Sequence, residues 1–182
     1  MKFVQEEFSH TLEIKKSKFI TYICPYDEFK NMMQRLKDEH PKARHFVYAY
    51  RFLNEFGQIV ENSSDDGEPK GTSGRPSLKV LDGNDLINTA VIIIRYFGGI
   101  KLGTGGLVRA YSDAVNLVIN ESTFKTYEDL QIKEITLQYS EISKMEYKLA
   151  QLGINIKNKD FSSNVLFTLE STQEKFDLLF KK

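Results

Sequence analysis

The chain has 182 residues, with 25 lysines and arginines against 25 aspartates and glutamates, and a single cysteine, Cys24. This length suits one globular domain or two small ones, and one cysteine excludes a disulfide framework and any multi-cysteine zinc or iron–sulfur site. A net charge of zero gives no overall field that points to nucleic acid or a membrane, and no apolar run approaches the roughly 20 residues of a membrane span; we expect a soluble cytoplasmic protein.

The first part of the chain alternates between strand and helix patterns. Residues 10–14 and 18–24 alternate around a polar turn, which predicts a hairpin. Asp27 is the expected N-cap of the amphipathic helix that follows. Residues 45–52 predict a strand with residues 58–62 as its partner, and its alternating aromatic side chains are expected to face the core rather than to form a base-stacking platform.

The middle of the chain contains a loop, two helices and a buried strand. Residues 63–76 are dominated by turn formers and predict a loop. Pro76 and Gly83 bracket a short helix. The near-continuous apolar run over 89–96 predicts a central strand covered on both faces, and the apolar stripe over 104–120 predicts a long helix.

The pattern turns polar after this helix, and we divide the chain into an N-terminal domain of residues 1–126 and a C-terminal domain of residues 127–182. The order β-α-β-β-α in the second domain is that of a ferredoxin-like unit without its final strand. Its expected elements are a strand at 130–139, a helix at 141–152, strands at 154–157 and 165–169, and a helix at 174–180.

A glycine-rich turn between the central strand and the long helix is the strongest local feature. Backbone N–H groups at a helix N-terminus make an anion-binding concavity that glycines leave open. The candidate anion- or nucleic-acid-binding residues are Arg95, Gly98, Gly99, Lys101, Gly103, Thr104, Gly105, Gly106 and Arg109. Neither a P-loop nor a dinucleotide fingerprint fits the spacing, so a tight strand-to-helix turn without a ligand stays open as the alternative.

The polar loop supplies a second set of candidate residues, with a histidine from the preceding strand. This set is His45, Asp65, Asp66, Glu68, Lys70, Thr72, Ser73 and Arg75. The carboxylates can hold a hard cation or supply a base, but they lack EF-hand spacing and Asp-Asp-Gly is ordinary turn chemistry, so no metal is assigned. A Ser73, His45 and Asp66 hydrolase arrangement lacks the nucleophile elbow, and no catalytic residue is assigned.

Together these motifs resemble the IMPACT/YigZ family over about residues 15–120. The segments that carry the resemblance are Ser17-Lys18-Phe19-Ile20, the strand at 43–50, the loop at 65–76 and the turn at 95–111. The resemblance implies an α+β protein in which a domain like the second domain of ribosomal protein S5 precedes a small ferredoxin-like domain. Both are similar to modules of elongation factor G.

The resemblance also implies a role in translation. Eukaryotic members regulate translation initiation by competing for the ribosome-associated co-activator of a stress kinase, and bacterial relatives are suspected of binding nucleic acid or the ribosome. We expect this chain to lack the extra N-terminal domain of the eukaryotic proteins, so the partners of those proteins are not assigned to it. No catalytic residues are established for the family, and none is transferred.

We therefore expect a non-enzymatic, translation-associated regulatory or binding protein whose basic turn contacts RNA, the ribosome or a protein partner in translation control. No cofactor and no membrane partner are expected. A small-molecule enzyme or a phosphate- or nucleotide-binding protein that combines the same turn with the loop at 65–68 is the alternative. A protein-interaction adaptor is the third interpretation, and the oligomeric state is open.

Overall fold

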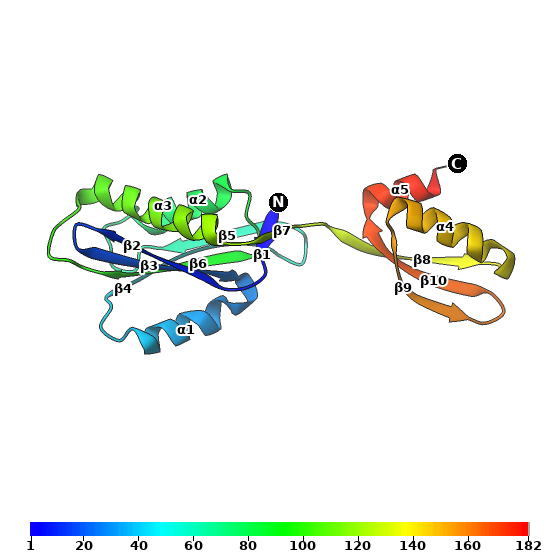
Figure 1. The fold of residues 1–182 in the computed structure, drawn as a ribbon, viewed down its shortest axis with the longest axis horizontal. Coiled ribbons are helices and arrows are strands. Elements are labelled where there is room, and N and C mark those ends of the chain that lie inside the picture. The colour runs from blue at the N-terminus through cyan, green and yellow to red at the C-terminus, as the bar shows by residue number, and fades with distance from the viewer. Residues whose placement is uncertain (182) are drawn as a thin grey trace. The chain divides into compact units, whose positions relative to one another are not determined.

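The computed structural model describes residues 1–181, and the chain divides into two compact units between Tyr127 and Glu128. Both units combine helices with antiparallel sheets, so the fold is mixed α+β (Figure 1). Among the described residues, no helix has both the length and the apolar character that crossing a membrane requires.

A five-stranded antiparallel sheet forms the frame of the first unit. Its strands run in the order β2 (Phe8–Ile14), β3 (Ser17–Pro25), β6 (Thr89–Tyr96), β4 (His45–Leu53) and β5 (Ile59–Ser64). β6 is central, and seven of its eight residues are buried. The expected strand with two covered faces is therefore confirmed, because a near-continuous apolar run is typical of a strand that is buried on both faces.

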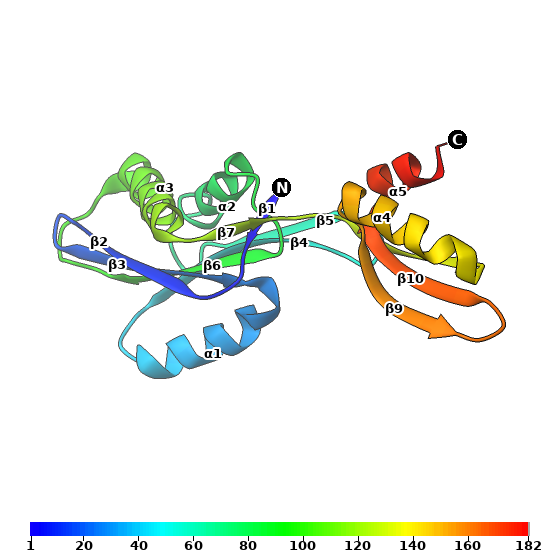
Figure 2. The same ribbon diagram turned by 45° about the vertical axis from the view of Figure 1, so that its right-hand side comes forward.

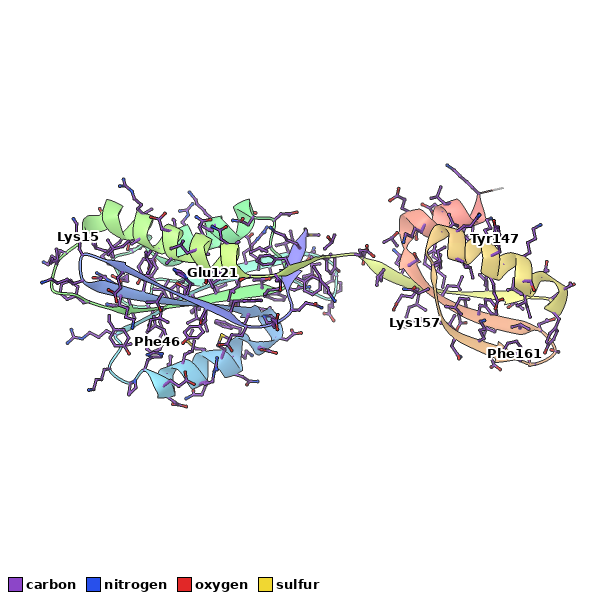
Figure 3. All side chains as sticks on the ribbon, viewed as in Figure 1. Lys15, Phe46, Glu121, Tyr147, Lys157 and Phe161 are labelled. Atoms are coloured by element: carbon purple, nitrogen blue, oxygen red, sulfur yellow. The ribbon has the colours of Figure 1, made fainter. Side chains whose placement is uncertain are left out.

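Helices cover both faces of this sheet. α1 (Phe29–Glu39) lies on one face, whereas α2 (Gly74–Gly83) and α3 (Gly103–Glu121) lie on the other (Figure 2). Alternate residues of β6 serve the two cores: Val91 and Ile93 pack with α2 and α3, and Ile92 packs with α1. Phe46 of β4 lies on the α1 side (Figure 3).

The start of α1 differs from the expectation that Asp27 caps it. A 3-10 turn over Tyr26–Glu28 precedes the helix, and Glu28 occupies the N-cap position without a side-chain cap bond. Tyr26 donates its N–H to the Asn88 carbonyl, and its ring stacks on Phe52 at 4.0 Å between centroids. These tertiary contacts hold the turn and outweigh the local capping preference of Asp27.

Two short strands at the ends of the first unit were not expected from the sequence. β1 (Lys2–Val4) and β7 (Phe124–Thr126) pair with each other in an antiparallel ribbon. Strands of three residues carry too little alternation to be recognised from sequence. The ribbon joins the two ends of the first unit and places Val4 in its core.

The second unit has the expected order β-α-β-β-α. Its elements are β8 (Leu130–Leu137), α4 (Ile142–Leu152), β9 (Asn155–Phe161), β10 (Val165–Thr172) and α5 (Gln173–Phe180). The sheet order is β8-β10-β9, and no further strand follows α5 within the described residues. The ferredoxin-like assignment, like the S5-like assignment of the first unit, stays a prediction.

The strand expected over 130–139 ends early in this unit. A 3-10 turn over Tyr139–Glu141 replaces its last residues, and Gln138 and Glu141 form a reciprocal capping box around it. In a capping box, each of the two side chains accepts a hydrogen bond from the backbone N–H of the other residue. Gly153 ends α4 with φ of +60°, as expected for a helix-terminating glycine.

Gly98 is a close-packing position where the chain leaves β6. A Cβ atom added there would lie 2.0 Å from the backbone carbonyl carbon and oxygen of Lys16. Both obstacles are backbone atoms beside β3, so they cannot move without shifting the sheet. A side chain at residue 98 is therefore excluded by the β3–β6 pairing.

We predict that Gly98→Ala lowers the free energy of unfolding by about 3 kcal/mol or more, because the methyl group overlaps backbone. The matched control is Gly105→Ala on α3, where an added Cβ meets nothing within 4 Å. That control is expected to be neutral or stabilising by up to about 1 kcal/mol. Urea denaturation followed by circular dichroism measures both, and equal midpoints for the two variants would contradict the prediction.

Candidate functional site

One end of the five-stranded sheet brings the two predicted sets of residues together. Strand pairing aligns Phe19, Arg95 and His45 in one row across β3, β6 and β4. The loop after β5 and the loop after β6 both leave from this end, and they lead into α2 and α3 respectively. The candidate loops therefore meet in space, which the sequence did not decide.

A buried ion pair between Arg95 and Glu68 joins the two loops. Arg95 Nη1 donates to both carboxylate oxygens of Glu68 at 2.7 and 2.9 Å, and the two side chains are only 6% and 3% exposed. The guanidinium carbon lies 5.5 Å from the ring centroid of Phe19. Nη1 of Arg95 is thus committed to Glu68 inside the protein rather than offered at the turn.

Tyr111 of α3 completes this ion pair. Its hydroxyl donates to Glu68 Oε1 at 2.8 Å, and its ring packs edge-on against Phe19. Burial, reinforced by the charge of Glu68, raises the pKa of the Tyr111 phenol well above its usual range. The hydroxyl therefore stays protonated and remains a hydrogen-bond donor. Sequence reasoning missed this residue because it occupies an apolar position of the helical stripe, 43 residues from its partner.

Asp65 organises the loop that leads into α2. Its carboxylate accepts hydrogen bonds from the N–H groups of Gly71, Ser73 and Gly74 at 2.7, 3.1 and 2.8 Å, and from the Ser73 hydroxyl at 2.8 Å. Burial alone raises the pKa of Asp65, but these hydrogen bonds outweigh it and hold the pKa below its usual value. The same bonds explain why α2 begins at Gly74, ahead of the expected start at Pro76.

Asp66 ties the loop to β4. Its carboxylate accepts the Phe46 N–H at 2.6 Å, and its carbonyl oxygen lies 2.8 Å from Nδ1 of His45. A carbonyl accepts only, so Nδ1 of His45 carries the proton and Nε2 is left available. Since Ser73 bonds to Asp65 and not to His45, these residues do not form a hydrolase triad. Among the described residues, no group of acidic, histidine or cysteine side chains is placed to hold a metal ion.

The remaining residues of the polar loop differ in exposure. Thr72 is buried and donates its hydroxyl to the Pro69 carbonyl at 2.6 Å. Lys70 and Arg75 are exposed. Of this predicted set, the carboxylates and the hydroxyls hold the loop in shape, and the two cations face solvent.

The turn that enters α3 is open and lacks acidic side chains. Lys101, Thr104 and Arg109 are exposed, and Gly99 and Gly103 have φ of +84° and +75°. Within residues 1–181, the first turn of α3 contains no acidic residue and no side chain caps its N–H groups. A groove of about 350 Å³ lies beside it, with Phe97, Leu102 and Leu107 in its walls and the Arg95–Glu68 pair at its side.

Cys24 is not part of any site. Its side chain is fully buried in the core on the α1 side, and burial raises the pKa of its thiol to about 12. The thiol is therefore protonated at neutral pH and unreactive, as a core-filling role requires.

This chain matches a known domain family, several sequence relatives and a solved structure. The model of the Impact N-terminal domain matches residues 15–119. An IMPACT family member of Haemophilus influenzae is 36% identical over 90% of this chain and 82% of its own length, and IMPACT family member YigZ of Escherichia coli is 38% identical over 85% and 77%. A crystal structure of a hypothetical protein matches with a TM-score of 0.67 and 31% identity, covering 98% of this chain and 88% of that one.

We predict that Glu68→Ala lowers the free energy of unfolding by about 3–5 kcal/mol, because it leaves the buried Arg95 charge without a partner. The double variant Glu68→Leu with Arg95→Met removes both charges and is expected to recover most of that loss. Chemical denaturation of both variants measures the difference. Glu68→Leu and Arg95→Met are measured singly as well, and a double variant that is as unstable as the sum of these two would show that the pair is not coupled.

We predict that Asp65→Asn lowers the free energy of unfolding by about 2 kcal/mol at pH 7, because four charge-assisted hydrogen bonds weaken. The lowered pKa means that the native state favours the ionised form, so its contribution is present above pH about 4 and is lost as pH falls through the folded-state pKa. The difference from the parent protein should therefore shrink on acidification. Asp27→Asn, at an exposed residue, is the control, and a gap independent of pH would contradict this role.

Proposed function

The chain belongs to the IMPACT family, and we propose that it is a cytoplasmic, translation-regulatory binding protein that contacts RNA or the ribosome through the turn at the start of α3. The observation that carries this proposal is the open, acid-free turn with exposed Lys101 and Arg109. The translation context comes from the family resemblance, whose eukaryotic members regulate translation initiation.

The chemistry of the turn suits a phosphate backbone. The N–H groups at the start of α3 have no capping side chain, and Gly105 has no neighbour within 4 Å of an added Cβ. A phosphate can therefore approach the backbone closely, where the helix dipole favours negative charge. Lys101 and Arg109 form no ion pair within the described part of the chain, so their charges are available to a polyanion.

Arg95 has a supporting role in this proposal. Its Nη1 is committed to Glu68, and the side chain is 94% shielded. It therefore fixes the base of the turn, and the direct contacts fall to Lys101, Thr104 and Arg109. We also propose that the two units have the S5-like and ferredoxin-like folds that the resemblance implies. The β-α-β-β-α order of the second unit supports the ferredoxin-like part of this proposal.

The hydrogen bonds made by the three carboxylates of the loop are the reason to propose binding rather than catalysis. Asp65 and Asp66 are each engaged with backbone N–H groups, and Glu68 is engaged with Arg95. None of the three is free to act as a general base on a ligand in the turn. A small-molecule enzyme that uses this loop is therefore the weaker proposal.

We predict salt-sensitive co-sedimentation with ribosomes or total RNA that Lys101→Ala with Arg109→Ala weakens. Removing two phosphate contacts should reduce the slope of log affinity against log salt by about 2. The matched control is Lys30→Ala with Lys144→Ala, which removes the same charge at exposed positions on α1 and α4. Sedimentation at two salt concentrations, with and without nuclease, gives the measurement.

The control separates a site from a general charge effect. Equal weakening in both double variants would mean that total charge, not the α3 turn, drives association. Unchanged binding in the Lys101 and Arg109 variant would remove the turn from the interface. No association under any condition would overturn the RNA and ribosome assignment.

A further inference from the structure

A second cavity opens at the same end of the sheet and has a different chemistry from the groove beside α3. It measures about 300 Å³, a volume suited to a small ligand. Its lining consists of Lys42, Arg44, His45, Arg95, Tyr96 and Phe97. No acidic side chain is among these residues, so the cavity collects three cations and a histidine in a chain whose net charge is zero.

The cations of this cavity retain unused hydrogen-bonding capacity. Lys42 and Arg44 are exposed, and neither forms an ion pair within residues 1–181. Arg95 is 6% exposed; its Nε has no hydrogen-bond partner in the described chain, and its Nη2 makes one long bond of 3.4 Å to Ser17. A buried guanidinium normally satisfies its donors, so this one is incompletely paired by the protein.

The neighbouring carboxylates leave the charges of Lys42 and Arg44 uncancelled; of the three cations, only Arg95 is neutralised, by Glu68. Glu68 is engaged with Arg95 Nη1 and Tyr111, and Asp66 is engaged with the Phe46 N–H. Neither carboxylate lines the cavity. His45 is held by the Asp66 carbonyl through Nδ1, which leaves Nε2 as its one uncommitted ring nitrogen.

An aromatic ring borders the cations. Phe97 is 57% exposed, although a large apolar ring normally avoids water. The Arg95 guanidinium lies 5.6 Å from its ring centroid, so the ring is held next to the charged part of the cavity. An exposed aromatic ring beside cations is the arrangement on which nucleobases stack while their phosphates are neutralised.

We propose that this cavity binds a nucleoside phosphate, with the phosphate among Lys42, Arg44 and His45 and the base against Phe97. The ligand is either a free mononucleotide or the 5′-phosphorylated end of an RNA, since both carry the same group. This site shares Arg95 and Phe97 with the groove beside α3, but neither Lys101 nor Arg109 lines it. It therefore stands or falls independently of the proposed backbone contact.

Isothermal titration with adenosine 5′-monophosphate, adenosine and inorganic phosphate tests the site. Adenosine 5′-monophosphate is expected to bind, inorganic phosphate to bind more weakly, and adenosine to bind weakest because it lacks the charged group. Lys42→Ala with Arg44→Ala should weaken nucleotide binding about tenfold or more, through the loss of charge-assisted hydrogen bonds. Both residues are exposed, so the variant keeps its fold.

Two further variants sharpen the test. Lys30→Ala with Lys144→Ala removes the same amount of charge from exposed positions on α1 and α4, and it should leave binding unchanged. Phe97→Ala should weaken binding of the nucleotide but not of inorganic phosphate. Short RNAs that carry a 5′-phosphate or a 5′-hydroxyl distinguish the source: preference for the phosphorylated end, lost in the Lys42 and Arg44 variant, identifies an RNA end, and binding of the mononucleotide alone identifies a free nucleotide.

Three results would overturn the assignment. The first is no measurable binding of either adenosine 5′-monophosphate or inorganic phosphate. The second is an equal loss of binding in the Lys30 and Lys144 control, which would make the effect one of total charge. The third is phosphate binding that gains nothing from the nucleoside, because Phe97 would then have no ligand.

Discussion

The buried pair of Arg95 and Glu68 is the interaction on which this end of the molecule depends. Taking both charges out of water is costly, and the cost is offset only when geometry and further hydrogen bonds are good. Here the partners come from four elements: Arg95 from β6, Glu68 from the loop after β5, Tyr111 from α3 and Phe19 from β3. The pair therefore holds the loop, the sheet and the helix in one arrangement.

The sequence could predict the elements whose hydrophobic period runs over several residues. β6 was recognised because a near-continuous apolar run spans its eight residues, and α3 because apolar positions repeat at helical spacing along its nineteen residues. The short ribbon of β1 and β7 was not, since three residues contain no measurable period. The predicted start of α1 was wrong for another reason. The stacking of Tyr26 on Phe52 is a tertiary contact, and local capping rules take no account of such contacts.

At the candidate site, the sequence predicted most of the residues that belong to the site but not what each of them does. The glycine-rich turn and the polar loop were both recognisable from residue types, but the tasks of their charged residues were not. Asp65 caps backbone N–H groups and Glu68 neutralises Arg95, although the sequence offered both as equivalent carboxylates. The difference arises from which donors the fold places beside each one, and the Tyr111 hydroxyl comes from 43 residues away.

This division of tasks explains how a neutral chain can present a positive surface. The three carboxylates of the loop are all engaged with internal donors, whereas Lys42, Arg44, Lys101 and Arg109 have no acidic partner in the described chain. Charges that face each other inside the protein contribute little to the field outside, while exposed unpaired cations act on a ligand within about a Debye length. Arg95 lines both the groove beside α3 and the cavity formed by Lys42, Arg44 and His45, so the pair that holds the fold also fixes the distance between the two proposed anion-binding sites.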